Sequence, residues 1–359
     1  MGSEEIGGWI VKFFGTVVVL LVVSSVGLMA QEMPPLAAVS PLWIGHLRPE
    51  GLELQEIEDQ GWTFSASYAY GNSFFASPEI TQTHAEINGI GADLTQEVLD
   101  QSRYLWPQID LFTIDTEASR FDIEAAYAWG RWFGGMGVPV WRFGGTRLDG
   151  WPTGTHDLLG VSNNGREYFP EGRTTVVLMP SDGGLWSFEG SQSTQVMGLN
   201  GWGGLRWSFG NGGRQKLWLA FSAPVGSDGP WGNRGWNGGP RWSISSRWGG
   251  LGLYGGLGWT HQGGDAGTLG DAADTFHGWG GADISLGRNW ALLVMFRIDD
   301  SVFADVASGK AGRTTGEFAL GFAAPLGREV RFQLVLGEDF PGMGMPPDFS
   351  IQGRLIWRP

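Results

Sequence analysis

The segment WTFSASYAY, residues Trp62–Tyr70, carries large apolar side chains at every second position and small or polar ones between them. Trp62 and Phe64 therefore share one face of an extended chain, and Thr63 and Ser65 share the other. Such alternation predicts a β-strand with a different environment on each side. An apolar face opposite a small polar face is typical of a membrane-spanning barrel strand, which meets lipid outside and the lumen inside.

A second segment, IDTEASRFDIEAAYAW (residues 114–129), adds charge to the same pattern. Phe121 and Ile123 lie on the expected outer face, and Asp122 and Glu124 lie on the inner face. Unpaired charge is costly inside a soluble β-sandwich. Successive charges on the inner face therefore favour a barrel with a wet lumen over a sandwich.

The alternation recurs along the rest of the chain, so we expect about twelve strands in all. Beyond the two segments above, the expected strands cover residues 217–225, 242–248, 251–259, 276–286, 290–298, 318–324, 330–336 and 349–357, with weaker signals at 135–145 and 196–209.

The connections between these strands alternate in length. Long ones are expected at residues 73–108, 147–195, 226–239, 263–274, 300–314 and 338–348, and short ones near 130–134, 210–214, 249–250, 287–289 and 326–328. Outer-membrane barrels have short periplasmic turns and longer extracellular loops. The predicted fold class is therefore all-β: a transmembrane antiparallel β-barrel of about 12 strands, with short periplasmic turns and long extracellular loops. Within the first long loop, residues 94–106 are expected to form a short helix with one apolar face, made by Leu94, Val98, Leu99, Tyr104 and Leu105.

Composition agrees with this fold and excludes some partners. The 359 residues include 61 Gly and 20 Trp, and glycine suits a barrel wall with bends and close backbone approaches. The formal net charge of −14 argues against nucleic acid as a partner, because phosphates require a basic surface. Tryptophan is favoured where a barrel crosses the two membrane interfaces. Those expected at or near strand ends are Trp62, Trp129, Trp242, Trp248, Trp259, Trp290 and Trp357.

The N-terminus predicts export. Lys12 precedes an apolar run at residues 13–30 that ends in small residues, as a cleaved secretory signal does. A retained membrane anchor is the alternative, since the run is long enough to span a bilayer. The expected organisation is a signal peptide at 1–30, a periplasmic segment or partial plug at 31–60, and the barrel at 61–359.

Residues 115–170 resemble an uncharacterised bacterial outer-membrane barrel family, domain of unknown function 3187. The resemblance rests on DTEASRF, MGVPV and GGTRLDGWPTGTHDLLGVSNNGREYFP. It implies an outer-membrane barrel and supplies no catalytic residue. The loop positions that match the family are Gly145, Leu148, Asp149, His156, Gly160, Gly165 and Arg166.

The candidate functional residues fall into two groups. In the long loop, Asp149, His156 and Arg166 could form a gate or binding element, or could fold the loop over the barrel. No spacing typical of a metal site, cofactor site or catalytic triad is present, so we expect no metal, no cofactor and no catalytic residue. By strand parity, the lumen-lining candidates are Asp122, Glu124, Arg241, Arg247, Asp283, Arg297, Glu317, Arg331 and Arg354.

Three functions are compatible with these residues. The first is a passive channel or small-solute transporter with a mixed-charge lumen, because pore charges set selectivity. The second is a structural or interaction barrel with a filled lumen, whose extracellular loops bind partners or lipopolysaccharide. The third, with least support, is a lipid-modifying enzyme of the outer membrane. The expected partners are outer-membrane lipid, lipopolysaccharide, the barrel-assembly machinery and small solutes.

Overall fold

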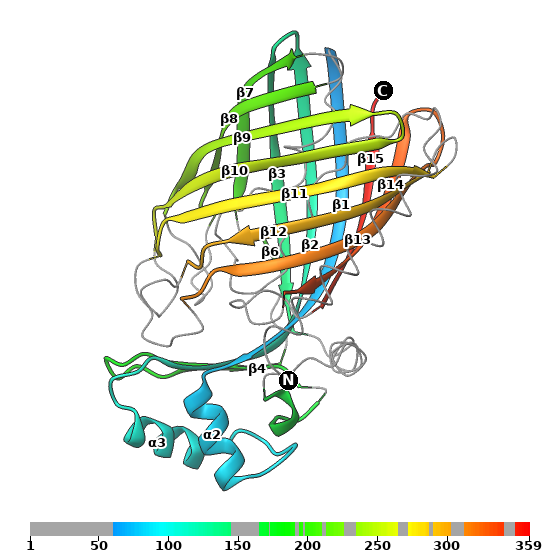
Figure 1. The fold of residues 1–359 in the computed structure, drawn as a ribbon. Helices are drawn as coiled ribbons and strands as arrows, with labels where there is room; N and C mark the ends of the chain where they lie inside the picture. Colours follow the sequence, from blue (N-terminus) through cyan, green and yellow to red (C-terminus); the bar gives the residue numbers. More distant parts are fainter. Residues whose placement is uncertain are drawn as a thin grey trace, which may run out of the picture.

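Twelve antiparallel strands form a closed transmembrane barrel in the computed structural model (Figure 1). The structure describes residues 60–144, 165–171, 173–190, 194–196, 198–209, 213–225, 235–264, 272–286, 290–302, 312–340 and 349–359. The barrel strands are β1 (Gln60–Ala76), β2 (Leu111–Trp129), β3 (Trp132–Phe143), β7 (Leu199–Phe209), β8 (Gly213–Ala223), β9 (Asn237–Trp248), β10 (Leu251–Gln262), β11 (Thr275–Leu286), β12 (Trp290–Asp299), β13 (Thr315–Pro325), β14 (Val330–Asp339) and β15 (Phe349–Trp357).

The barrel closes between its first and last strands. Each barrel strand pairs with its successor in the chain, and β1 also pairs with β15, with Ser67 opposite Arg354. Closure removes the unpaired strand edges that a membrane cannot solvate. The predicted fold class is confirmed, including the strand number and the alternation of long and short connections.

Burial follows the period of two read from the sequence. In β1, Trp62 is about half exposed, whereas Thr63 and Ser65 are buried. In β2, Ile123 is exposed and its neighbour Asp122 is buried. The outer face is therefore apolar and the inner face polar, as a lipid-exposed wall around a lumen requires.

Exposed tryptophans gather where the barrel meets its short turns. Trp129 and Trp132 flank the β2–β3 turn, and Trp248 and Trp290 lie at the ends of β9 and β12. This position suits an interfacial girdle, in which indole rings contact both lipid and headgroups. The prediction was wrong for Trp242, which lies in the middle of β9.

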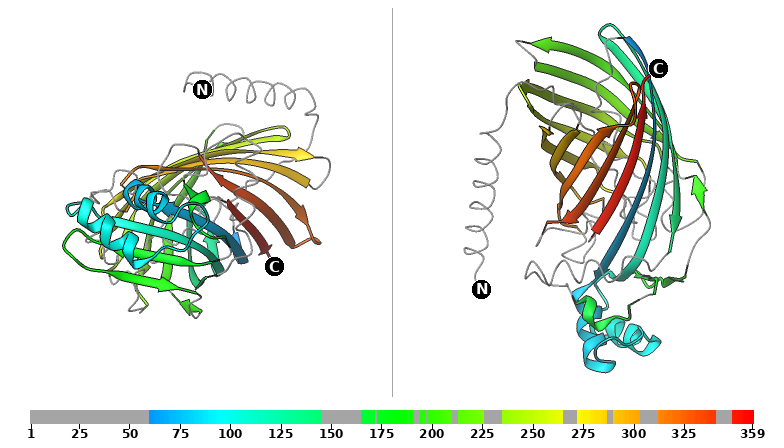
Figure 2. Two further views of the ribbon diagram at one scale, coloured as in Figure 1. Left: turned by 90° about the horizontal axis from the view of Figure 1, so that it is seen from below. Right: turned by 90° about the vertical axis from the view of Figure 1, so that its right-hand side faces the viewer.

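At the long-loop end, β1 and β2 run beyond the barrel into a small folded unit that we call the cap (Figures 1 and 2). The cap consists of the ends of β1 and β2 with α2 (Pro78–Ile87), α3 (Gln96–Leu105), the 3-10 helix η3 (Arg166–Tyr168), β4 (Thr175–Met179) and β5 (Trp186–Glu189). β4 pairs with β2, and β5 pairs with β4. A further two-residue strand, β6 (Gln195–Val196), pairs with β3.

The cap has its own hydrophobic core. Phe74 from β1, Ile80 from α2, Leu99 from α3 and Val177 from β4 are buried in one cluster. His84 of α2 donates from Nε2 to the Tyr168 carbonyl at 2.8 Å, which ties α2 to η3. Packing of this kind makes the cap a folded extension of the barrel rather than an irregular loop.

The cap corrects two predictions for the long loops. Residues 73–108 contain α2 and the end of β1, and residues 147–195 contain η3, β4 and β5. The predicted helix is present as α3. Its expected apolar face is right for Leu94, Val98 and Leu99, which are buried or pack against the cap core, but wrong for Tyr104 and Leu105, which are exposed. No helix in the described part of the chain is long and apolar enough to cross a membrane. The predicted signal peptide (1–30) and the segment that follows it lie outside the described residues, apart from Gln60.

Candidate functional site: the lumen wall

The structure places all nine lumen-lining candidates on the inner face of the barrel. Seven have less than a tenth of their surface exposed, and Arg247 and Arg331 are partly buried. That these residues line a conducting lumen remains a prediction. Seven of the nine, all except Glu317 and Arg331, belong to two arrangements of contacts.

The first arrangement, which we call the ion-pair wall, spans β15, β1 and β2. Arg354 of β15 forms an ion pair with Glu124 of β2 across β1. Ser65, on β1 between them, donates to Glu124 Oε2 at 2.6 Å. On the same face of β2, two residues from Glu124, Asp122 Oδ1 accepts from Arg120 Nε at 2.7 Å. Buried charges are tolerated where each has an opposite charge and hydrogen bonds, and these charges have both.

The second arrangement is centred on β10, whose sequence LGLYGGLGWTHQ puts glycines on the inner face. Gly252 lies directly opposite Arg247 on β9 and Asp283 on β11, whose charged groups come within 3.7 Å of each other. A Cβ at Gly252 would lie 2.3 Å from the Asp283 carboxylate. Glycine here leaves a trough in which side chains from β9 and β11 meet.

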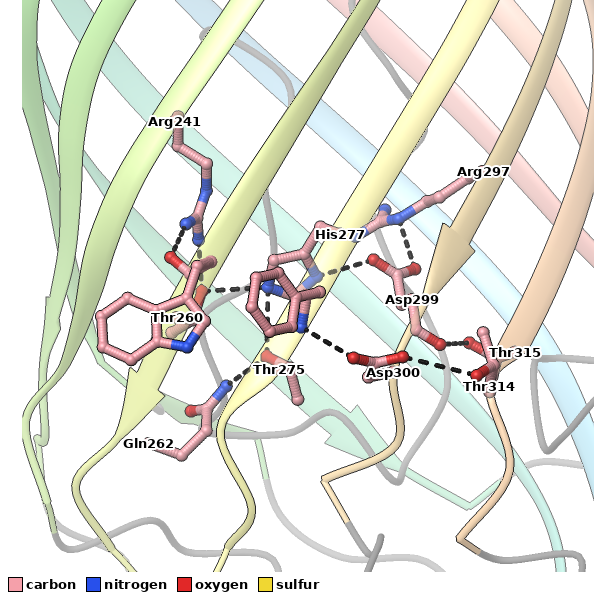
Figure 3. Close-up of polar contacts among 12 residues, drawn as sticks. Arg241, Thr260, Gln262, Thr275, His277, Arg297, Asp299, Asp300, Thr314 and Thr315 are labelled. Atoms are coloured by element: carbon pink, nitrogen blue, oxygen red, sulfur yellow. Dashed lines mark hydrogen bonds and ion pairs between the residues drawn. The ribbon is translucent and has the colours of Figure 1, made fainter.

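A chain of polar contacts, the polar row, crosses β10 near its other end, at Thr260 (Figure 3). Arg241 of β9 donates to Thr260 Oγ1 of β10, which lies 2.9 Å from Nε2 of His277 on β11. His277 Nδ1 lies 2.8 Å from Asp299 Oδ1, and Arg297 Nε lies 2.7 Å from the other carboxylate oxygen. A carboxylate can only accept, so Nδ1 carries a proton. In the neutral imidazole Nε2 then accepts from a threonine hydroxyl, with Thr260 at 2.9 Å and Thr275 at 3.1 Å.

Within the polar row, Thr260, His277 and Asp299 have the order of a nucleophile, a base and an orienting carboxylate. Thr260 and His277 are almost completely buried, and Arg241 also donates to the same hydroxyl oxygen. A nucleophilic hydroxyl donates its proton to the base and must present its oxygen to the substrate. Here that oxygen is buried and accepts from Arg241. The contacts therefore favour a buried structural network over a reactive group.

Large aromatic side chains lie next to the polar row and form a cluster that we call the indole cluster. It contains Trp202, Trp218 and Trp279, with Phe133 and Tyr254. The ring of Trp218 lies 6.3 Å from that of Phe133 and 6.4 Å from that of Trp279, measured between centroids. The three indole nitrogens are buried and find no acceptor among the described residues.

The rings of this cluster lie along the wall, over glycines of neighbouring strands. Trp279 is paired with Gly256, where a Cβ would lie 2.2 Å from the ring. Trp202 is paired with Gly135, where a Cβ would lie 2.5 Å from the ring. Inward glycines thus provide the space into which the large side chains turn. This accounts for part of the high glycine content.

Of the loop candidates, Arg166 is described, whereas Asp149 and His156 lie outside the described residues. Arg166 is buried at the base of the cap, donates to Asn72 Oδ1 at 2.8 Å and lies 3.5 Å from Asp115. Its guanidinium also covers the Phe74 ring at 5.5 Å. These contacts join the loop to β1 and β2, so Arg166 fits the reading in which it folds the loop over the barrel.

Sequence reasoning overlooked His277, Asp299, Arg120 and Lys216 as site residues. All four are buried on the inner face. Parity could have found the first two, because each follows an outward residue, Phe276 or Ile298, at a strand end. In the part of the chain that the structure describes, no group of three or more His, Cys, Asp or Glu could hold a metal ion.

Comparisons with known proteins show a similarity of fold and no match in sequence. No family model matches the chain, and no curated protein matches it in sequence. The chain is similar to the crystal structure of an outer-membrane channel from Pseudomonas putida F1, with a TM-score of 0.50, 11% identity, and coverage of 84% of this chain and 96% of that one.

Two further structures align with lower scores. A monoaromatic hydrocarbon channel, CymD, has a TM-score of 0.38 at 11% identity, with 84% of this chain and 89% of that chain covered. The translocator domain of the autotransporter NalP from Neisseria meningitidis has a TM-score of 0.40 at 12% identity, with 84% and 90% covered. These likenesses concern the barrel fold, and membership of domain of unknown function 3187 stays a prediction.

Proposed function

We propose that this chain is a narrow outer-membrane channel along whose lumen small solutes pass. The observation that carries the proposal is the placement of large inward side chains against neighbouring strands, as with Trp279 over Gly256. About eight strands give a filled interior and about sixteen an aqueous channel, so twelve strands allow either. Side chains that lie along the wall occupy less of the lumen than side chains that extend toward the barrel axis.

Two further observations support a narrow, selective route. Most inward charges are buried among their neighbours, which is unlike the exposed wall of a wide aqueous pore. The fold is shared, at a TM-score of 0.50, with a protein described as an outer-membrane channel. Rings of charged side chains in a narrow bore select ions by sign.

The proposed location is the bacterial outer membrane. Residues 1–30 would direct export and be removed, and residues 31–60 would stay in the periplasm or enter the barrel as a partial plug. The apolar outer face would contact outer-membrane lipid and lipopolysaccharide after insertion by the barrel-assembly machinery. No role for nucleic acid is proposed, given the net charge of −14.

Ion conductance of the purified, heat-modifiable barrel in planar bilayers tests the channel. We expect small, discrete conductance steps. The variant Arg331→Glu, on a partly buried inward position, should change the ratio of anion to cation permeability, whereas Arg142→Gln on the exposed side of β3 should not. A correctly folded barrel that never conducts would overturn the proposal.

A structural or interaction barrel is the second candidate, and the ion-pair wall favours it. Arg354, Glu124, Arg120 and Asp122 are buried and mutually paired, as in an interior that closes the lumen. The same bilayer experiment separates the two functions. Lipid hydrolysis by the same preparation would instead support the enzyme hypothesis.

A further inference from the structure

The inner face of β7, β8 and β9 is cationic, although the whole chain has a net charge of −14. Arg206 of β7 lies directly opposite Lys216 of β8. Arg241 and Arg247 follow on β9. The sequences of β7–β10 contain no Asp or Glu. Asp283 of β11 compensates Arg247 across Gly252, but basic residues still outnumber acidic ones on this part of the wall. An excess of positive charge between low-dielectric walls concentrates anions.

The indole cluster lies on the same part of the wall. Trp218 is two residues from Lys216 on the inner face of β8 and directly opposite Arg241. An indole N–H can donate a hydrogen bond but cannot accept one. The indole nitrogens of Trp202, Trp218 and Trp279 are buried without an acceptor among the described residues. Buried donors normally have partners, so these groups point to a molecule that brings acceptors.

Ring packing adds a second property to the site. The Trp218 ring lies 6.3 Å from Phe133 and 6.4 Å from Trp279, within the range of aromatic contacts. Another planar ring would extend this arrangement by stacked or edge-on contacts. The site therefore combines aromatic surfaces, hydrogen-bond donors and positive charge.

From these features we infer that the wall of β7–β9, together with Trp279, binds small aromatic carboxylates. The ring lies among the indoles, and the carboxylate accepts from indole N–H groups near Lys216 and Arg241. The inference rests on the proposed channel for passage of the ligand. Binding itself does not require conduction and can be measured separately.

Calorimetric titration of the folded barrel in detergent tests binding. Benzoate is the probe, cyclohexanecarboxylate has the same charge without aromaticity, and benzyl alcohol is an uncharged aromatic. We expect benzoate to bind at least tenfold more tightly than either. Equal affinity for benzoate and cyclohexanecarboxylate, or no heat from benzoate, would overturn the inference.

Matched variants locate the site. Trp218→Phe keeps a ring but removes one donor, and loss of one hydrogen bond to a charged group should weaken benzoate binding about tenfold. Trp248→Phe removes the same group from an exposed rim position and should leave affinity unchanged. Lys216→Gln should weaken benzoate without changing benzyl alcohol. Unchanged benzoate affinity in folded Trp218→Phe and Lys216→Gln would place any binding elsewhere and overturn the assignment.

Bilayer recordings distinguish failure of this inference from failure of the channel. Anion selectivity with benzoate block, reduced in Lys216→Gln, is the expected result. A barrel that conducts but prefers cations and ignores benzoate would overturn the inference and leave the channel intact. A barrel that binds benzoate in solution but never conducts would overturn the channel and leave the binding site.

Discussion

Strands β1 and β10 each lie beneath an ion pair that their two neighbouring strands form, but they have different residues at that position. Each lies between two strands whose larger inward side chains meet across it: Arg354 with Glu124 over β1, and Arg247 with Asp283 over β10. The residue beneath the ion pair is Ser65 on β1 and Gly252 on β10. Small residues on the middle strand thus let charges two strands apart approach each other.

The difference lies in what the middle residue contributes. The Ser65 hydroxyl donates to Glu124 and receives a hydrogen bond from Arg354, so it is part of the ion-pair wall. Gly256 contributes no side chain, and the Trp279 ring lies over it. Serine therefore supports a closed ionic network, whereas glycine leaves an apolar surface for aromatic rings. The first arrangement suits stability, and the second suits a route or a site.

The largest effect is expected from Glu124→Ala, which leaves Arg354 buried beside the gap. Removing one partner of a buried pair costs about 3–5 kcal/mol, because the remaining charge stays desolvated. The free energy of unfolding, measured by urea titration of the barrel in lipid, checks this. The double variant Glu124→Leu with Arg354→Met should recover much of the loss. A single variant as stable as the parent would show that the ion-pair wall is not structural.

A smaller effect is expected when serine is placed on β10 by Gly256→Ser. The new Cβ would lie 2.2 Å from the Trp279 ring and force it toward the lumen. Overpacking of this kind costs about 1–3 kcal/mol, and the displaced ring should also lower single-channel conductance. Gly278→Ala on the outer side of β11 is the control, since its Cβ meets Leu257 at an ordinary 3.6 Å. Equal conductance in both variants would contradict the role given to the glycine.

The reverse exchange, Ser65→Gly, should be milder. It removes the hydroxyl from Glu124 but leaves the pair between Glu124 and Arg354 in place. The expected loss is about 1–2 kcal/mol, from one hydrogen bond and added backbone freedom. Urea unfolding of Ser65→Gly beside Ser65→Ala separates the two contributions. A loss as large as that of Glu124→Ala would mean that serine, rather than the ion pair, holds this wall together.

The smallest effect is expected outside both regions. Trp248 is exposed at the short-turn rim, so Trp248→Phe keeps a large ring in the interface. Stability should change by about 0.5 kcal/mol or less, as for most surface substitutions. Conductance and ion selectivity should match those of the parent. A change in selectivity would show that the rim, as well as the lumen wall, controls passage.

Sequence alone predicted the barrel because the alternation of apolar and polar side chains within each spanning strand shows which face meets lipid and which faces the lumen. Trp62 against Thr63, or Ile123 against Asp122, shows which face meets lipid without reference to any other strand. Gly249 and Gly250 similarly mark a short turn. The cap was not predicted, because β4 carries no alternation of this kind and is a strand through its pairing with β2.

The parity of a strand likewise determined which charges face inward, since successive side chains point to opposite sides. Tertiary structure decided which of them meet. Glu124 and Arg354 are 230 residues apart, and only the closure between β1 and β15 brings them together. The same holds for Trp279 and Gly256, whose contact depends on the register of β10 against β11. A local pattern specifies a face, whereas a contact across strands depends on register, which the whole closed sheet sets.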